Sequence, residues 1–237
     1  MRLAVVIPAY QAAATLAEVI LRLDPYVARE FIWVIDDGSR DGTGEVARTL
    51  RVNLGGFAAN RGKGHALADG FRRSRDADVV VTLDADGQHP PECLPAFLAA
   101  AGSADIVVGC RQRAANMPAA RRVANWASSR WATWLAGQPV GDSQSGYRLY
   151  ARRVIDEVPA GTGGYEWESR ILVRAAQLGF RLGQVEIPTV YGEETSHLNP
   201  FRDAPRIVGT LARLSWEKWV PPAELRDARA RMSVPGR

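Results

Sequence analysis

Short apolar runs alternate with amphipathic stretches along the first half of the chain. The runs rich in β-branched and apolar residues, typical of strands buried on both faces, are Leu3–Pro8, Phe31–Asp36, Val79–Asp84 and Ile106–Gly109, with a shorter one at Val52–Leu54. The stretches with apolar residues at helical spacing are Thr15–Leu23, Thr43–Leu50 and Gly64–Arg75. This alternation predicts an α/β domain with a mostly parallel sheet, in which ligands bind beyond the carboxyl ends of the strands.

Two carboxylates stand where one of these strands runs out. Asp84 and Asp86 end the Val79 strand, and Gly87 follows them. Two such charges one residue apart repel each other, so both stay ionised most easily with a cation between them. Gln88 adds a neutral oxygen, and oxygen ligands of this kind suit Mg²⁺ or Mn²⁺. An ordinary turn explains the motif nearly as well, but Asp37, at the end of another predicted strand, favours a metal and nucleotide site.

Charge is divided unevenly along the 237 residues. The net charge is +4, yet residues 1–110 hold 11 basic and 14 acidic residues, and residues 111–237 hold 19 and 12. All basic residues except Lys63 and Lys218 are arginine, which contacts phosphate in a bidentate way. A GC-rich genome would also favour arginine. The division suits a metal site in the first half and anionic groups in the second, and no nucleic-acid-binding motif is present.

Several common classes of protein are disfavoured. Pro8-Ala9-Tyr10-Gln11 follows the first strand in place of Gly-x-Gly-x-x-Gly, and Gly62-Lys63-Gly64 lacks the spacing of a P-loop. No apolar run approaches the ~20 residues that span a bilayer, and no cleavable leader is recognisable. Cys93 and Cys110 have no metal-binding spacing and are expected as thiols in a reducing cytoplasm, with a disulfide left open. Tyr10 offers a ring to a nucleotide base, or it is a core aromatic.

An ordered series of motifs resembles the glycosyltransferases of family 2, in their dolichol- or polyprenyl-phosphate sugar synthase branch, up to about residue 205. The motifs are Pro8-Ala9-Tyr10, Asp36-Asp37-Gly38-Ser39-x-Asp41-Gly42-Thr43, Arg61-Gly62-Lys63-Gly64, Asp84-Ala85-Asp86-Gly87-Gln88, Gly109-Cys110-Arg111, Asp142–Arg148, Glu166-Trp167-Glu168 and Glu186-Ile187-Pro188. One departure is Gln11-Ala12, where the family has Asn-Glu, which removes a carboxylate near the nucleotide.

The resemblance implies a GT-A-type fold, a nucleotide-sugar donor (GDP- or UDP-sugar), a Mg²⁺ or Mn²⁺ ion and an inverting transfer. It assigns the metal to Asp84, Asp86 and Gln88. It assigns the nucleotide to Pro8, Tyr10, Asp37, Lys63 and Asp84. Asp86, Arg111 and Arg148 are expected to be catalytic, with both arginines facing phosphate groups. Gln144, Ser145, Gly146 and Tyr147 are expected to form the acceptor loop.

The acceptor expected from the resemblance is a polyprenyl phosphate. Its second pKa of ~6 makes it largely a dianion that needs no general base. A hydroxyl acceptor would need one, and Glu166, Glu168 and Asp142 are the candidates, although capping of a helix over Tyr165–Leu178 is the preferred interpretation of Glu168. The alternatives are another lipid or a soluble glycan as acceptor, a sugar-phosphate nucleotidyltransferase, and a binding protein with a dead site.

Tryptophans gather in two later segments. Pro118–Gly137 places Val123 and three tryptophans within one arc of a helix, and Asp203–Val220 mixes two tryptophans with arginine and lysine. Both suit a lipid interface or packing against the sheet. The resemblance favours peripheral contact with a membrane, so we expect a cytoplasmic protein on the inner face of the plasma membrane. The expected organisation is a catalytic domain over 1–205, an amphipathic helix over 206–220 and a disordered tail over 221–237.

Overall fold

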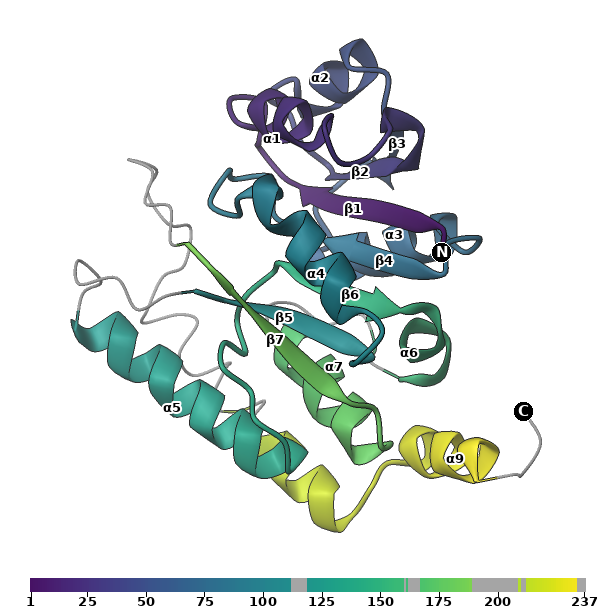
Figure 1. The fold of residues 1–237 in the computed structure, drawn as a ribbon, viewed down its shortest axis with the longest axis vertical. Helices are drawn as coiled ribbons and strands as arrows, with labels where there is room; N and C mark the ends of the chain where they lie inside the picture. The colour runs from purple at the N-terminus through teal and green to yellow at the C-terminus, as the bar shows by residue number, and fades with distance from the viewer. Residues whose placement is uncertain (112–118, 160, 162–166, 189–208, 210–211, 234–237) are drawn as a thin grey trace.

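The structure, a computed structural model, describes residues 1–111, 119–159, 161, 167–188, 209 and 212–233. Its centre is a seven-stranded sheet with the strand order β3-β2-β1-β4-β6-β5-β7. The strands are β1 (Leu3–Ala9), β2 (Ile32–Asp37), β3 (Asn53–Phe57), β4 (Val79–Thr82), β5 (Ile106–Arg111), β6 (Arg148–Ala151) and β7 (Leu182–Ile187). The predicted α/β architecture with a mostly parallel sheet and flanking helices is confirmed (Figure 1).

One strand of this sheet runs against the others. β6 lies antiparallel between β4 and β5, with Thr82 opposite Arg148, whereas β1 pairs in parallel with β2 and β4, and β5 with β7. The carboxyl ends of the parallel strands therefore share one edge of the sheet with the amino end of β6. Two distant parts of the sequence, residues 84–88 and 142–148, meet at that edge. We did not predict β6 as a strand, because its four residues begin with an arginine and form no continuous apolar run.

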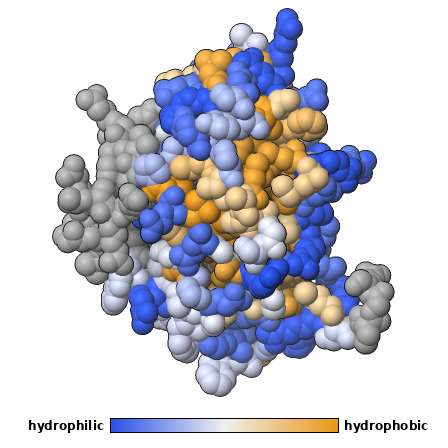
Figure 2. Space-filling view, viewed as in Figure 1, coloured by the Kyte–Doolittle hydropathy of each residue, from blue (hydrophilic) through white to orange (hydrophobic). Residues whose placement is uncertain are grey.

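Helices cover both faces of the sheet. The helices are α1 (Leu16–Leu23), α2 (Thr43–Thr49), α3 (Lys63–Arg73), α4 (Leu94–Ala100), α5 (Ala119–Ala136), α6 (Arg152–Glu157), α7 (Trp167–Gln177) and α9 (Ala223–Met232), with short 3-10 turns η1 (Arg29–Phe31) and η2 (Pro91–Cys93). Buried residues of α1, α2 and α4 form one apolar core with the sheet, and those of α3, α5, α6, α7 and α9 form the other. Apolar residues show at the surface over the middle of the viewed face, where α4 lies (Figure 2).

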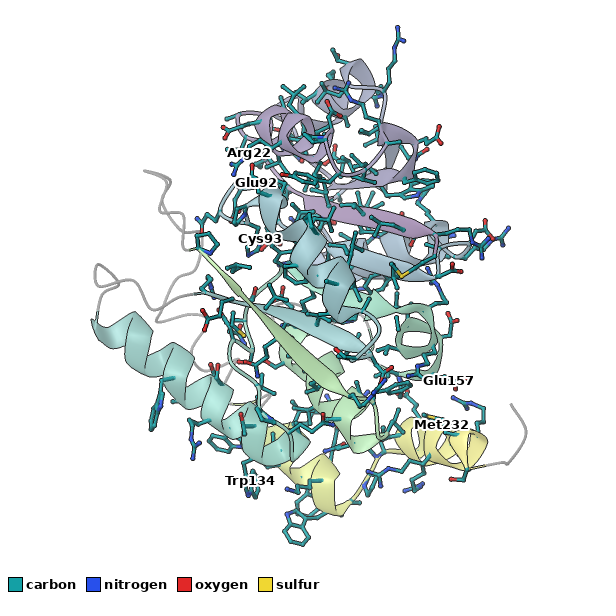
Figure 3. All side chains as sticks on the ribbon, in the orientation of Figure 1. Arg22, Glu92, Cys93, Trp134, Glu157 and Met232 are labelled. Atoms are coloured by element: carbon teal, nitrogen blue, oxygen red, sulfur yellow. The ribbon has the colours of Figure 1, made fainter. Side chains whose placement is uncertain are left out.

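Ion pairs join some of these elements at the surface. Arg22 on α1 and Glu92 on η2 face each other (Figure 3), and the arginine Nε lies 2.9 Å from Oε1 of the glutamate. An exposed pair of this kind contributes at most about 1 kcal/mol. The two buried cores therefore provide most of the stability that holds the strand ends in place.

The end of the chain differs from the prediction. We expected a disordered tail from Pro221, but α9 forms there, and its Leu225 and Ala228 are fully buried in the core that contains α7. The prediction failed because two apolar residues three apart are a weak signal among many arginines, and only the surface that receives them makes the helix stable. Of the predicted helix over Asp203–Val220, the structure describes residue 209 and residues 212–219, which are helical. No described helix is long and apolar enough to cross a bilayer.

Candidate active site

The loop after β2 fixes the loop after β1. Asp41 accepts hydrogen bonds from Thr43, through both its hydroxyl (2.6 Å) and its backbone N–H (3.1 Å), and from the backbone N–H of Ala13 (3.0 Å). Burial opposes ionisation of Asp41, but these hydrogen bonds outweigh it and lower the pKa of the carboxyl below its ordinary value. The acidic motif after β2 is thus, in large part, a scaffold for the neighbouring strand end.

That scaffold leaves Tyr10 at the surface. Pro8 is buried within β1, while the side chain of Tyr10, just beyond the strand, is 50% exposed. Gln11 takes a left-handed backbone conformation (φ 53°), and its N–H donates to Ser39 Oγ (3.0 Å). The ring of Tyr10 is therefore not a core aromatic, and it is available to stack on a base at the carboxyl edge of the sheet.

Asp37 is buried and holds the loop before α3. Its Oδ1 accepts the N–H of Arg61 (2.8 Å) and its Oδ2 accepts the N–H of Gly62 (2.7 Å). This close approach needs a glycine at position 38, where φ is +78° and a Cβ would lie 2.6 Å from the carbonyl carbon of Ala59. In the structure Asp37 therefore acts first on the protein itself, because it positions Lys63 at the start of α3.

Lys63 bridges two carboxylates from distant parts of the chain. Its Nζ lies 2.6 Å from Asp84 Oδ1 and 2.6 Å from Glu168 Oε1. Burial lowers the pKa of Lys63, but the two carboxylates outweigh it and raise the pKa above its ordinary value. Burial likewise opposes ionisation of Asp84, yet Lys63 above all lowers its pKa to about 2. The Lys63–Asp84–Glu168 cluster thus places one ammonium group between two carboxyl groups.

Glu168 belongs to this cluster. We expected Glu168 at the amino end of its helix, and it lies in the first turn of α7; its side chain is only 5% exposed and pairs with Lys63. The pairing with Lys63 was not predicted, because the sequence does not show that α7 begins beside α3. Glu166, the other candidate in this motif, lies outside the described residues.

His89 contacts Asp84 within the loop that follows β4. It is buried, and its Nδ1 accepts the backbone N–H of Asp84 (3.1 Å) while lying 3.7 Å from Asp84 Oδ2. Burial lowers the pKa of the imidazole, so it is neutral at physiological pH, with the proton on Nε2. We did not predict a role for His89 in the site, although its position five residues after Asp84 in the same loop was a usable signal.

Gly146 makes room for the cluster. A Cβ on this residue would lie 2.5 Å from Asp84 Oδ2 and 2.7 Å from Lys63 Nζ. Its carbonyl accepts a hydrogen bond from the hydroxyl of Thr82 (2.8 Å), which fixes the loop to the end of β4. Of the predicted acceptor loop, Gly146 therefore touches the charged cluster directly.

The other residues of that loop have different surroundings. Tyr147 is fully buried and stacks on Phe97, with the ring centroids 4.2 Å apart, and burial raises its pKa. Ser145 is also fully buried. Gln144 is half-buried, and its side-chain amide donates to Ser169 Oγ (2.8 Å) on α7. Tyr147 and Ser145 pack inside the domain, and Gln144 links the loop to α7.

Arg148 requires a correction. We expected Arg148 to face a phosphate group, but its side chain is completely buried. Its guanidinium donates to the backbone carbonyls of Ser145 (2.7 Å), Ser143 (2.9 Å) and Glu168 (2.6 Å). No face of it is left for a ligand. Arg148 instead connects the 143–145 loop to the start of α7, and it is covered because it lies between β4 and β5, opposite Thr82 and Val108.

Arg111 lies at the carboxyl end of β5 and keeps a link to the cluster. Its guanidinium pairs with Asp142 in a bidentate way, with Nε 2.7 Å from Oδ2 and Nη2 3.2 Å from Oδ1. Burial lowers its pKa, but Asp142, and more weakly Asp84 and Glu168, raise it above the ordinary value. The residue remains 24% exposed, so it can meet an anionic ligand.

The donor set fits a hard divalent cation only in part. Asp86 is exposed, makes no ion pair with any described residue, and its Oδ1 accepts the N–H of Gln88 (2.9 Å). Across the described residues no three His, Cys, Asp or Glu side chains are grouped to hold a metal. Asp84 and Asp86 remain, with the half-buried Gln88 beside them, and all their donor atoms are oxygens. Such a set suits Mg²⁺ or Mn²⁺ that takes its other ligands from water and a diphosphate.

A mixed seven-stranded sheet with acidic residues at its carboxyl edge defines the GT-A class of nucleotide-sugar transferase folds. The sequence profile of "Glycosyl transferase family 2" matches residues 4–159. The chain belongs to this family and is a glycosyltransferase. It is 33% identical to an undecaprenyl-phosphate mannosyltransferase of Micrococcus luteus, over 99% of this chain and 100% of the relative. It is 32% identical to a polyprenol monophosphomannose synthase of Mycolicibacterium smegmatis, over 81% and 78%. Both relatives lie in the predicted branch of the family.

Solved structures agree on the fold. Glucosyl-3-phosphoglycerate synthase of Mycobacterium tuberculosis, crystallised with Mn²⁺, UDP-glucose and phosphoglyceric acid, superimposes with a TM-score of 0.75. The match covers 94% of this chain and 81% of that chain, at 20% identity. Family membership sets aside the nucleotidyltransferase and the binding protein with a dead site.

Proposed function

We propose that this glycosyltransferase moves a sugar from a nucleotide-sugar donor to a polyprenyl phosphate. The observation that carries the proposal is that both candidate bases among the described residues, Asp142 and Glu168, are paired with cations; Glu166, the third candidate, lies outside the described residues. Asp142 is held by Arg111, and Glu168 by Lys63, so each already serves as the counter-ion of a cation. Neither is free to take a proton from an acceptor hydroxyl. A phosphate acceptor needs no such base, because it is already an anionic nucleophile.

The relatives' names support the same acceptor class. Both curated relatives are named for transfer to a polyprenyl or undecaprenyl phosphate, and one of them matches along its whole length. Since such an acceptor resides in a bilayer, we expect the reaction at a membrane surface, on the cytoplasmic side where nucleotide sugars are made. GDP-linked and UDP-linked sugars are both candidate donors.

In the proposed reaction an oxygen of the acceptor phosphate forms a bond to the anomeric carbon. The bond between that carbon and the donor diphosphate breaks, and its electron pair leaves with the nucleoside diphosphate. We expect an inverting transfer, with attack from the side opposite the leaving group. Lys63 and Arg111 supply positive charge at the edge where the diphosphate departs. The ring of Tyr10 offers a stacking surface to the base.

A divalent cation would be held at the same edge of the sheet. Asp84, Asp86 and Gln88 are the residues that would hold Mg²⁺ or Mn²⁺, and the bound ion would add charge stabilisation to the departing diphosphate. Asp84 is paired with Lys63 in the structure, so a bound cation would share the oxygens of Asp84 with the Lys63 ammonium. Glu168 keeps a second hold on Lys63, which allows the ammonium to stay in the site when Asp84 is engaged elsewhere.

The test is transfer of labelled sugar to defined lipids. We expect label from one nucleotide sugar, in a panel of GDP- and UDP-linked donors, to appear on undecaprenyl phosphate but not on undecaprenol. EDTA should abolish the transfer, and added Mn²⁺ or Mg²⁺ should restore it. Asp86→Asn should abolish activity without lowering the melting temperature, because the side chain is exposed, and Asp76→Asn, exposed and outside the site, should act like the wild type. Transfer to undecaprenol or to a soluble glycan would contradict the proposal.

A further inference from the structure

Five of the seven tryptophans gather on two helical segments. Trp126, Trp131 and Trp134 on α5 are 53%, 40% and 52% exposed, and Trp216 and Trp219 in the helical segment 212–219 are 68% and 76% exposed. We call these five residues the tryptophan face. Such a group of large exposed apolar side chains costs free energy in water and marks an interaction surface.

Direct contacts hold the two segments together. The indole N–H of Trp131 donates to Ser215 Oγ (3.0 Å). Lys218 Nζ donates to the backbone carbonyl of Trp134 (3.0 Å) and lies 4.3 Å from the centre of its ring. Trp134 extends from the end of α5 away from the sheet (Figure 3). The tryptophan face is therefore one surface built from both segments.

Packing within the domain does not explain these tryptophans. Among the side chains of α5 whose burial is described, residues 126–136, the buried ones are Ser128, Ser129, Ala132, Leu135 and Ala136, all smaller than tryptophan. From the segment 212–219, Leu214 is the apolar side chain that enters the core. Core packing, which the sequence left open, is thus achieved without the five indoles.

The charges exposed on the two segments have one sign. Arg130 on α5 is exposed, as are Arg213 and Lys218 on the second segment. The single acidic residue among residues 119–136 and 212–219, Glu217, is 5% exposed and pairs with Arg174 (2.8 Å) and Arg213 (3.3 Å). A second copy of this chain would bring like charges together on this face. An anionic lipid surface complements them, and indoles prefer the interface between lipid and water.

We propose that the tryptophan face seats the enzyme on an anionic bilayer. The inference deepens the proposed function, on which it rests, since it identifies the surface that meets the membrane containing the acceptor. The position of α5 fits this role. Residues 112–118 alone separate Arg111, at the active-site edge, from the start of α5, which then runs along the outside of the domain (Figure 1). A bilayer in contact with α5 would hold a lipid phosphate near Arg111.

The proposal is tested first without donor or acceptor. Wild-type protein should co-sediment with vesicles of phosphatidylglycerol and phosphatidylcholine, and bind at least tenfold more weakly to phosphatidylcholine alone. The triple variant Trp126→Ala, Trp216→Ala, Trp219→Ala should lose at least tenfold in vesicle affinity with little change in melting temperature, because all three side chains are exposed. Phe31→Ala, which removes a 45% exposed aromatic from η1, should bind like the wild type.

A second measurement separates this proposal from the proposed function. On a short-chain, water-soluble polyprenyl phosphate the triple variant should keep wild-type activity, while on undecaprenyl phosphate in vesicles it should lose at least tenfold. Equal binding of wild type and variant to vesicles, or equal binding to neutral and anionic vesicles, would overturn the membrane proposal even if the transferase activity is as proposed. A wild-type dimer that the triple variant abolishes would also overturn it and assign the face to a second copy.

Discussion

Gly146→Ala is a sharp test of how the charged cluster is built. The backbone of Gly146 does not have a positive φ, so alanine fits its conformation. The added Cβ, however, would lie 2.5 Å from Asp84 Oδ2, where ordinary contact begins at 3.4 Å. Asp84 must therefore move by about 0.9 Å, and Lys63, 2.7 Å from the same Cβ, must move with it. Both are ends of flexible side chains, so the fold should survive.

The expected result follows from that displacement. Misplacing a group in the site by about 1 Å costs on the order of 100-fold in rate. We therefore expect kcat/KM of Gly146→Ala to fall about 100-fold, with weaker binding of the nucleotide sugar and a melting temperature close to that of the wild type. The assay is transfer of labelled sugar at several donor concentrations, with thermal unfolding measured on the same samples.

A matched control is available at Gly102. A Cβ there meets nothing within 4 Å, and φ is not positive, so Gly102→Ala should leave both activity and stability unchanged. Retention of activity within about threefold in Gly146→Ala would refute the reasoning. A rise in KM for the acceptor alone, with donor binding intact, would refute it too, since that result fits the acceptor role expected from the sequence.

Two further predictions concern buried charges. Arg148→Met should lower stability by roughly 3 kcal/mol or more, because three carbonyls lose their donor. Arg111→Lys keeps a cation beside Asp142, so it should lower activity with a smaller loss of stability. Thermal unfolding and activity, measured on both variants, separate the two roles, and a stable but inactive Arg148→Met would restore the phosphate role of Arg148. Asp69 pairs with Arg73 (2.6 Å) and Arg72; burial opposes its ionisation, but the arginines lower its pKa below the ordinary value of 3.8. Its stabilisation is therefore present above that value and lost as the pH falls below it. The melting-temperature difference between wild type and Asp69→Asn should narrow below about pH 4, and a constant difference would contradict the assignment.

The sequence was informative where a local pattern is enough. Strands β1, β2, β4 and β5 follow from short apolar runs, and the acidic residues that end β2 and β4 follow from the rule that ligands bind at the carboxyl edge. The helices α1, α2, α3 and α5 follow from their helical spacing. These features depend on residues close together in the chain, which the periodicity of side-chain directions reveals.

The direction of each side chain in the site depended on the tertiary structure. Arg148 and Arg111 are similar in the sequence, each an arginine beside a motif, yet one is fully buried and the other is partly exposed. The difference arises from the register of the strands: Arg148 lies opposite Thr82 and Val108 inside the sheet, whereas Arg111 stands at the end of β5. Glu168 meets Lys63 only because α7 begins beside α3, across more than a hundred residues of sequence.

By itself, then, the sequence determined the α/β class, the edge of the sheet at which the acidic residues gather and the glycosyltransferase family. The tertiary structure alone decided that Lys63 pairs with both Asp84 and Glu168, and that Arg148 is buried and connects a loop to α7. It alone also decided that five tryptophans point away from the core. The physical reason is that periodicity records which residues of one element share a side. Which side packs inward, and which distant charge it meets, is set by long-range contacts between elements.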